Sequence, residues 1–119
     1  MKESDLQRHC MSLLNRSGLC WWRMPVSGVP QSIGRKIIFK ASPIKGFPDL
    51  AGVRCDGVFW ACELKSDKGK LSEDQNDWIA KLSAAGAITR VVRTPEEMEA
   101  FIIELGGKIK PLPKRNGSI

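Results

Sequence analysis

The chain has 119 residues, of which 42% are hydrophobic and 27% are charged, the size and composition of one globular domain with its own core. Nineteen Lys and Arg against thirteen Asp and Glu give a net charge of +6, so a polyanion such as nucleic acid is the favoured partner. No apolar run reaches the roughly 18 residues that span a bilayer, which argues against a membrane protein. The four cysteines include no CxxC pair, which argues against a zinc site, and we expect them to be free thiols in the cytoplasm.

The first half of the chain predicts one amphipathic helix followed by four short strands. Apolar residues recur at helical spacing up to Gly18, which stands where a C-terminal cap is expected. The expected elements are a helix over residues 4–17 and strands over residues 19–24, 35–40, 47–54 and 58–65. Residues 27–34 are expected to form a loop, and the last two strands a hairpin around Cys55-Asp56-Gly57.

The second half predicts a helix, a strand, a second helix and a basic tail. Ser72 and Gln75 form a capping-box pattern, and Thr94 before Pro95 is a typical helix start. The expected elements are helices over residues 73–85 and 95–105 and a strand over residues 87–93. The order α-β-β-β-β-α-β-α favours an α/β sandwich with a mixed sheet, formed by residues 1–107. The tail, residues 108–119, has four cations and no carboxylate side chain, so we expect it to be flexible and either to contact DNA or to be merely solvated.

Two charged residues, Glu63 and Lys65, lie in the otherwise apolar last strand of the predicted hairpin. They project from the same face, and each charge is costly to bury. Whether Asp49 joins them depends on the hairpin loop. A two-residue loop would place Asp49 opposite Leu64, with Glu63 on the other face. A three-residue loop ending in Gly57 would place Asp49 directly opposite Glu63.

Directly opposed carboxylates destabilise a sheet, so the three-residue register favours a cation bound between Asp49 and Glu63. Oxygen ligands without His or Cys suit Mg²⁺ or Mn²⁺, which can generate a hydroxide nucleophile and offset charge on a phosphodiester. Lys65 could hold that nucleophile or stabilise the developing charge. The alternative is structural: Asp49 caps a turn, while Glu63 and Lys65 form an exposed pair on an edge strand.

Three segments in this order carry a family resemblance: Gly46-Phe-Pro-Asp49, Glu63-Leu-Lys65, and Gly69-Lys-Leu-Ser-Glu-Asp-Gln75 followed by Trp78. Together they resemble the VRR-NUC branch of the PD-(D/E)XK nuclease superfamily over nearly the whole chain. The resemblance implies a restriction-endonuclease-like sandwich and a metal-dependent DNA endonuclease. Family members that consist of this domain alone resemble Holliday-junction resolvases, which act as homodimers, and a nuclease this small is expected in a phage or a mobile element.

The resemblance also implies roles for individual residues. Asp49 and Glu63 would bind Mg²⁺ or Mn²⁺ together with the backbone carbonyl of Leu64, and Lys65 would be the catalytic lysine. These four positions follow the family's motif residue by residue.

Two further residues match the family's pattern but also have local explanations. Glu3 matches an acidic metal ligand on the first helix, although an acid at a helix N-terminus is favourable in itself. Gln75 would hydrogen-bond the active site, or serve only as the capping-box partner of Ser72. Phosphate contacts are expected from a cluster of cations upstream of the hairpin: Arg35, Lys36, Lys40 and Lys45.

Two other functions remain open on the same fold. A non-catalytic DNA-binding module would account for the basic balance and the basic tail. An RNA-directed or nicking activity would use the same site residues on a different substrate.

Overall fold

The computed structural model describes residues 1–24, 29–40 and 44–114, and only the backbone of residues 29–33 and 37–40. Its helices are α1 (Glu3–Asn15), α2 (Glu73–Ala84) and α3 (Pro95–Glu104). Its strands are β1 (Cys20–Arg23), β2 (Val29–Ile33), β3 (Lys36–Lys40), β4 (Leu50–Val53), β5 (Phe59–Leu64) and β6 (Ile88–Val92). In this described part, no helix has the length and apolar character needed to cross a membrane.

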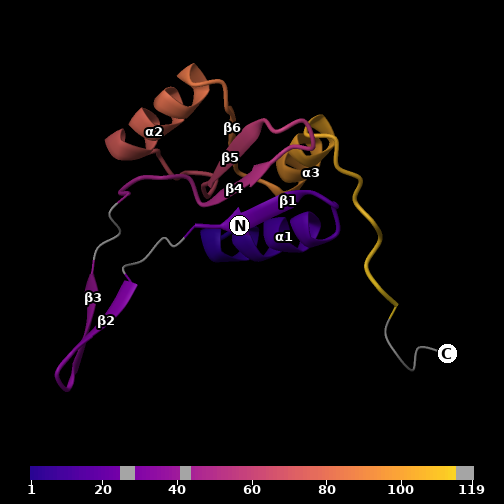
Figure 1. Cartoon of the computed structure of the whole chain (residues 1–119). Helices are drawn as coiled ribbons and strands as arrows, with labels where there is room; N and C mark the ends of the chain where they lie inside the picture. The colour runs from indigo at the N-terminus through magenta and orange to yellow at the C-terminus, as the bar shows by residue number, and fades with distance from the viewer. Residues whose placement is uncertain (25–28, 41–43, 115–119) are drawn as a thin grey trace.

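A four-stranded mixed sheet forms the centre of the body, in the order β1-β4-β5-β6 (Figure 1). β4 pairs antiparallel with β1 and β5, whereas β5 and β6 run parallel. α1 and α3 pack together on one face of the sheet, and α2 lies on the opposite face beside β6. The fully buried Trp60 of β5 meets Phe101 of α3 edge to face, with ring centroids 5.8 Å apart. The expected α/β architecture with a mixed sheet is therefore confirmed.

Helix starts follow the local signals that the sequence carries. The Ser72 hydroxyl accepts a hydrogen bond from the Gln75 backbone N–H at 3.2 Å, and the Gln75 side chain accepts one from the Ser72 N–H at 2.9 Å. This is the predicted capping box, and it sets where α2 begins. The Thr94 hydroxyl caps α3 by accepting a hydrogen bond from the Glu97 backbone N–H at 3.1 Å, with Pro95 at the first helical position, and the Glu97 carboxylate accepts from the Arg93 N–H.

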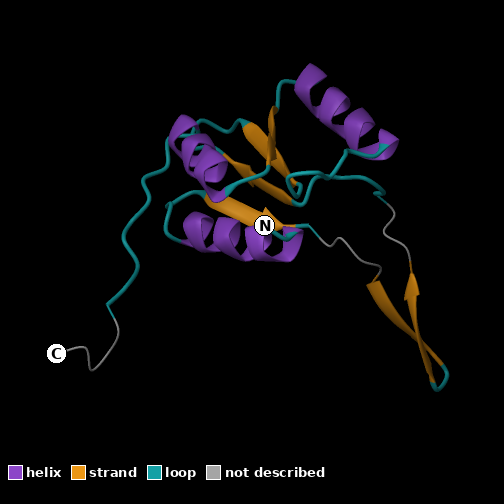
Figure 2. Cartoon of the chain, turned by 180° about the vertical axis from the view of Figure 1, so that it is seen from behind, coloured by secondary structure: helices purple, strands orange, loops and turns teal. Residues whose placement is uncertain are grey.

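The expected loop over residues 27–34 is wrong in part, because Val29–Ile33 forms β2. β2 pairs only with β3 in a separate two-stranded sheet, so the strand expected over residues 35–40 lies outside the central sheet (Figure 2). Gly34, with φ at +61°, makes the two-residue turn that brings the strands together. Pro30 lowers the strand signal, yet both strands of such a ribbon have a free edge where its missing N–H costs nothing.

The beginning of the basic tail is attached to the body. Lys108 N–H donates to the Ser17 carbonyl at 3.1 Å, and Lys110 N–H donates to the Arg16 carbonyl at 2.9 Å. The Arg16 guanidinium donates back to the Lys110 carbonyl at 2.9 Å. Residues 111–114 are exposed, and the last five residues of the predicted tail lie outside the described residues.

Candidate active site

The register of the β4–β5 hairpin decides whether the two candidate carboxylates meet. Leu50 pairs with Cys62, and the three-residue loop ends in Gly57, whose φ of +88° favours glycine. Continuing the same register by one residue sets Asp49 opposite Glu63. The structure thus has the three-residue alternative, and both carboxylates project from the same face of the hairpin.

Both carboxylates are buried, and each is held by a neighbouring donor. Asp49 is 5% exposed and Glu63 is 2% exposed. The Leu64 backbone N–H donates to Asp49 Oδ2 at 2.9 Å, and Gln75 Nε2 donates to Glu63 Oε1 at 2.9 Å. Glu63 Oε2 is also buried and receives no hydrogen bond from a donor among the described atoms, although a proton on Glu63 can be donated to Asp49. An oxygen in this state is suited to a ligand from outside the chain.

Burial dominates the electrostatics of this pair. It raises the pKa of Asp49 above its ordinary value, against the effect of the Leu64 N–H and the Lys65 charge. It raises the pKa of Glu63 to about 8, and the negative charge of Asp49 acts in the same direction. Near neutral pH, the free protein therefore keeps a proton on Glu63, and a bound cation would take the place of that proton.

The Gln75 side chain performs both roles that its sequence context allows. Its amide oxygen accepts from the Ser72 N–H as part of the capping box, and its amide nitrogen donates to Glu63. An amide can do both at once because it carries an acceptor and two donors. The cap of α2 and the orientation of Glu63 are thus fixed by one residue, while a catalytic role for Gln75 remains a prediction.

The loop ahead of Asp49 fixes the N-terminal end of α2. Lys45 forms an ion pair with Asp74 at 3.6 Å, and the ring of Phe47 meets Trp78 edge to face at 5.2 Å. Gly46 has φ at +81°, and a Cβ there would lie 2.6 Å from the Asp74 backbone. Only glycine allows this approach, so the loop places α2 where its Gln side chain reaches the buried carboxylate of β5.

Lys65 directly follows β5 and is half-buried, with its backbone N–H donating to the Val92 carbonyl at 3.0 Å. Its ammonium makes no ion pair with the described residues, although its charge lowers the pKa of both carboxylates. Sequence reasoning missed Arg93, whose Nη1 donates to the Ser66 and Gly69 carbonyls, each at 2.7 Å. Arg93 closes the loop that follows Lys65, and no local pattern signals a contact between segments this far apart in sequence.

Glu3 lies at the start of α1, beside a pocket of about 220 Å³ at the end of the sheet. The residues lining this pocket are Glu3, Ser4, Gln7, Asp49 and Leu64. Glu3 is exposed, and residues 1–24, 29–40 and 44–114 contain no group of three or more His, Cys, Asp or Glu side chains that could hold one metal ion. The structure thus brings Asp49 and Glu63 together and leaves Glu3 facing a pocket that Asp49 and Leu64, but not Glu63, also line. The role of Glu3 as a ligand stays a prediction.

A second residue that the sequence did not single out is Arg23 at the end of β1. Its charge lowers the pKa of Asp49. With the Gln7 amide oxygen turned toward it, Arg23 Nε donates to that oxygen at 3.1 Å. Arg23 pairs with Leu50 in the sheet and so stands next to Asp49, which only the β1–β4 register reveals.

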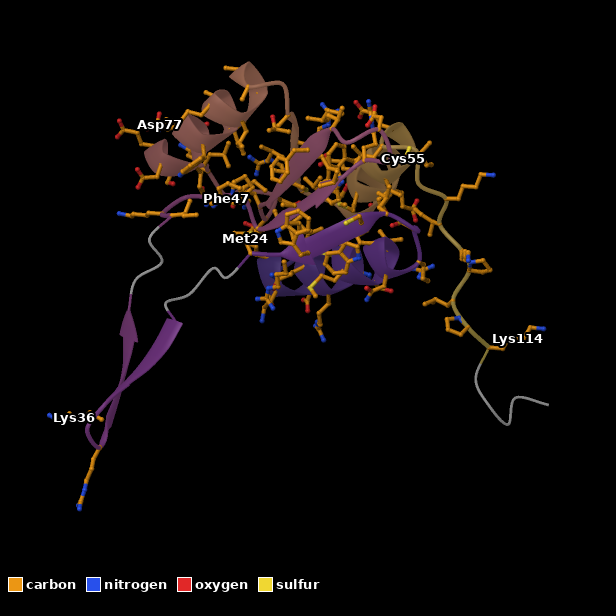
Figure 3. All side chains as sticks on the ribbon, viewed as in Figure 1. Met24, Lys36, Phe47, Cys55, Asp77 and Lys114 are labelled. Atoms are coloured by element: carbon orange, nitrogen blue, oxygen red, sulfur yellow. The ribbon has the colours of Figure 1, made fainter. Side chains whose placement is uncertain are left out.

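The structure describes the side chains of three of the predicted phosphate-binding cations, and none of the three forms an ion pair with Asp49 or Glu63. Arg35 and Lys36 are exposed at the tip of the β2–β3 ribbon, far from the body (Figure 3). Lys45 is exposed on the loop that packs against α2. The side chain of Lys40 lies outside the described residues.

Comparison with known proteins gives one family and one fold. The family model described as the VRR-NUC domain matches residues 1–95, which include all the candidate catalytic and metal-binding positions. Among solved structures, a chain described as a VRR_NUC domain protein superposes with a TM-score of 0.55 at 18% identity, over 89% of this chain and 91% of that one. At this identity, the likeness concerns the fold alone. No curated protein matches the sequence at a significant level.

Proposed function

The chain belongs to the VRR-NUC domain family, a family of nuclease domains, and on this premise we propose that it is a metal-dependent endonuclease that hydrolyses DNA phosphodiesters. The observation that carries the proposal is the buried pair of Asp49 and Glu63 at the end of the β4–β5 hairpin. Two neighbouring buried carboxylates are costly to ionise unless a cation binds between them. A pair of this kind does not stabilise the fold, so binding of a cation explains its presence better than a structural role does.

The donors at this site fit a hard divalent cation. Asp49, Glu63 and the Leu64 carbonyl would hold Mg²⁺ or Mn²⁺, since the set consists of oxygen atoms without imidazole or thiolate. Glu63 Oε2, which receives no hydrogen bond from a donor among the described atoms, supports this assignment. Glu3 would complete the set from across the pocket that it lines together with Asp49 and Leu64. When bound, such a cation lowers the pKa of a coordinated water and offsets charge on the phosphodiester.

The remaining side chains orient these ligands and carry charge. The Leu64 N–H holds the Asp49 carboxylate at 2.9 Å, and Gln75 holds Glu63 at the same distance. Hydrogen bonds of this kind keep ligands in a productive geometry before the metal arrives. Lys65, which makes no ion pair with the described residues, can donate to an attacking water or to a phosphate oxygen as negative charge develops.

Branched DNA is the substrate that we propose, with the Holliday junction as the leading candidate. A four-way junction offers two equivalent cleavage points, which a two-fold homodimer would match. The positive net charge supports a nucleic-acid substrate and predicts binding that weakens as salt is added. Bacterial or phage-infected cytoplasm is the proposed location.

The proposal is tested with purified protein on four end-labelled DNA substrates: four-way junction, flap, duplex and single strand. Cleavage is expected with Mn²⁺ or Mg²⁺, strongest on the junction, and lost with EDTA or in Glu63→Ala. Glu99→Ala, which removes an exposed carboxylate of α3, is the matched control and should cleave like wild type. Mn²⁺ should also raise the melting temperature of wild type but not that of Asp49→Asn.

Cleavage that survives both EDTA and Glu63→Ala would rule out this mechanism. Salt-sensitive DNA binding without a Mn²⁺-dependent rise in melting temperature would indicate the non-catalytic module instead. An RNA strand cleaved in preference to all four DNA substrates would show that the substrate class is wrong.

A further inference from the structure

The β2–β3 ribbon, residues 29–40 and here named the basic arm, projects from the body of the protein (Figures 1 and 2). Across the described residues, β2 and β3 pack on each other rather than on the helices or the central sheet. The radius of gyration is 16.3 Å, against roughly 13–14 Å for a compact domain of this length, and both this ribbon and the segment that follows α3 extend from the body.

The charge of the arm has one sign. Residues 29–40 contain three Lys or Arg residues, Arg35, Lys36 and Lys40, and no Asp or Glu. Arg35 and Lys36 are exposed at the turn, and Lys36 lies at the end of the arm remote from Met24 and Phe47, which mark where it leaves the body (Figure 3). Like charges oppose pairing of this arm with the arm of a second copy, whereas they attract a polyanion.

The arm leaves the body next to the candidate active site. Met24, the last described residue before the arm, donates its backbone N–H to the Asp49 carbonyl at 2.7 Å. A phosphodiester at the carboxylate pair would therefore have its flanking nucleotides near the base of the arm. Five residues per strand at ~3.3 Å each extend the arm by about 17 Å, the length of about five base pairs.

We propose that the basic arm binds a groove of a double-stranded DNA segment on one side of the cleavage point, with Arg35 and Lys36 on the phosphate backbone. A two-stranded ribbon fits the major groove of B-form DNA, which is about 12 Å wide. This inference rests on the proposed nuclease function and narrows its substrate. A productive substrate carries a duplex flank of about five base pairs, which single-stranded DNA lacks.

The test measures DNA binding in EDTA, so that it does not depend on cleavage. The variant is Arg35→Ala/Lys36→Ala, and the control is Arg8→Ala/Lys81→Ala, which removes one Arg and one Lys from the exposed surfaces of α1 and α2. Fluorescence anisotropy over a salt series should show the slope of log K against log salt reduced by about 1.8 for the arm variant on a junction, the value for two lost phosphate contacts. The control should keep the wild-type slope.

A second series varies the duplex flank of the substrate. Wild-type affinity should rise with flank length up to about five base pairs and then level off, while the arm variant should respond little. An unchanged salt slope in the arm variant would overturn the proposal. A second variant replaces residues 29–40 by a Gly-Ser turn. If this variant is a monomer where wild type is a dimer, and if it binds DNA as tightly as wild type, the arm is a contact between subunits and the proposal is wrong. If the arm variant changes the salt slope but the wild-type protein cleaves no substrate, the proposed nuclease function is wrong and the proposed DNA binding by the arm still holds.

Discussion

Replacing Glu63 by Gln tests the electrostatics of the buried pair without relying on activity. In the metal-free protein the pKa of Glu63 is raised from 4.5 to about 8, chiefly by burial. The stability contributed by the retained proton is present in full below the unfolded-state value and is lost as the pH rises through the folded-state value. Wild-type stability should therefore fall between pH 6 and pH 8. Gln is neutral at every pH, so this loss should disappear in the variant.

The magnitude follows from the width of the shift. Well between the two pKa values each pH unit changes the free energy of unfolding by about 1.4 kcal/mol, and the change flattens near the folded-state pKa, which gives a loss of about 2 kcal/mol from pH 6 to pH 8. At about 4 °C per kcal/mol, this corresponds to a melting temperature lower by about 8 °C. The introduced amide can still accept from Gln75 Nε2, and its own NH₂ can donate toward Asp49, so the substitution preserves the local hydrogen bonding.

Thermal unfolding in EDTA at both pH values provides the measurement. Glu63→Gln should melt about 8 °C above wild type at pH 8 and close to it at pH 6. Glu99→Gln, which neutralises an exposed carboxylate on α3, is the matched control and should follow the wild-type profile. Parallel profiles for wild type and Glu63→Gln, or a Glu63→Gln protein less stable at pH 8, would refute the claim that Glu63 holds a proton in the folded state.

Three further predictions concern the neighbours of this pair. Lys65→Ala should slow cleavage by about 10²–10³-fold in time courses while keeping the Mn²⁺-dependent rise in melting temperature; loss of that rise would make Lys65 part of the metal site. Gln75→Glu keeps a capping-box acceptor but sets a carboxylate against Glu63. It should lower the free energy of unfolding by ~1–2 kcal/mol at pH 8 and by much less at pH 5, and equal losses at the two pH values would exclude charge repulsion as the cause. Gly46→Ala should lower the free energy of unfolding, measured by urea unfolding, by ~2–3 kcal/mol. The control Gly86→Ala, at a positive φ with open space around it, should lower it by ~1 kcal/mol. Similar losses in the two variants would show that the contact between Gly46 and α2 is unimportant.

Local sequence signals predicted the parts of the fold that depend on residues close together in the chain. The capping box joins Ser72 to Gln75, three positions apart, and the cap of α3 joins Thr94 to the backbone N–H of Glu97, again three positions apart. Such features form wherever the chain can adopt the required backbone angles. They therefore follow from the local sequence without any knowledge of tertiary contacts.

The β2 strand was missed because its stability comes from its partner. Val29–Ile33 includes Pro30 and two polar residues, which lower strand propensity, and the ribbon forms through pairing with β3 across Gly34. The position of the ribbon outside the central sheet is equally invisible to local pattern. Both depend on which segments pair, and pairing is a property of the whole chain.

The candidate carboxylates, the lysine beside them and the condition under which they share a site can all be read from the amino-acid sequence, because strand geometry ties the face of a side chain to residue parity. Three features needed the folded chain: the register of the hairpin, the depth at which Asp49 and Glu63 are buried, and the bridge that Gln75 makes from Glu63 to the cap of α2. The difference arises because alternation along a strand is a local property of the backbone. Burial and hydrogen bonding between β5 and α2 depend instead on the packing of segments distant in sequence.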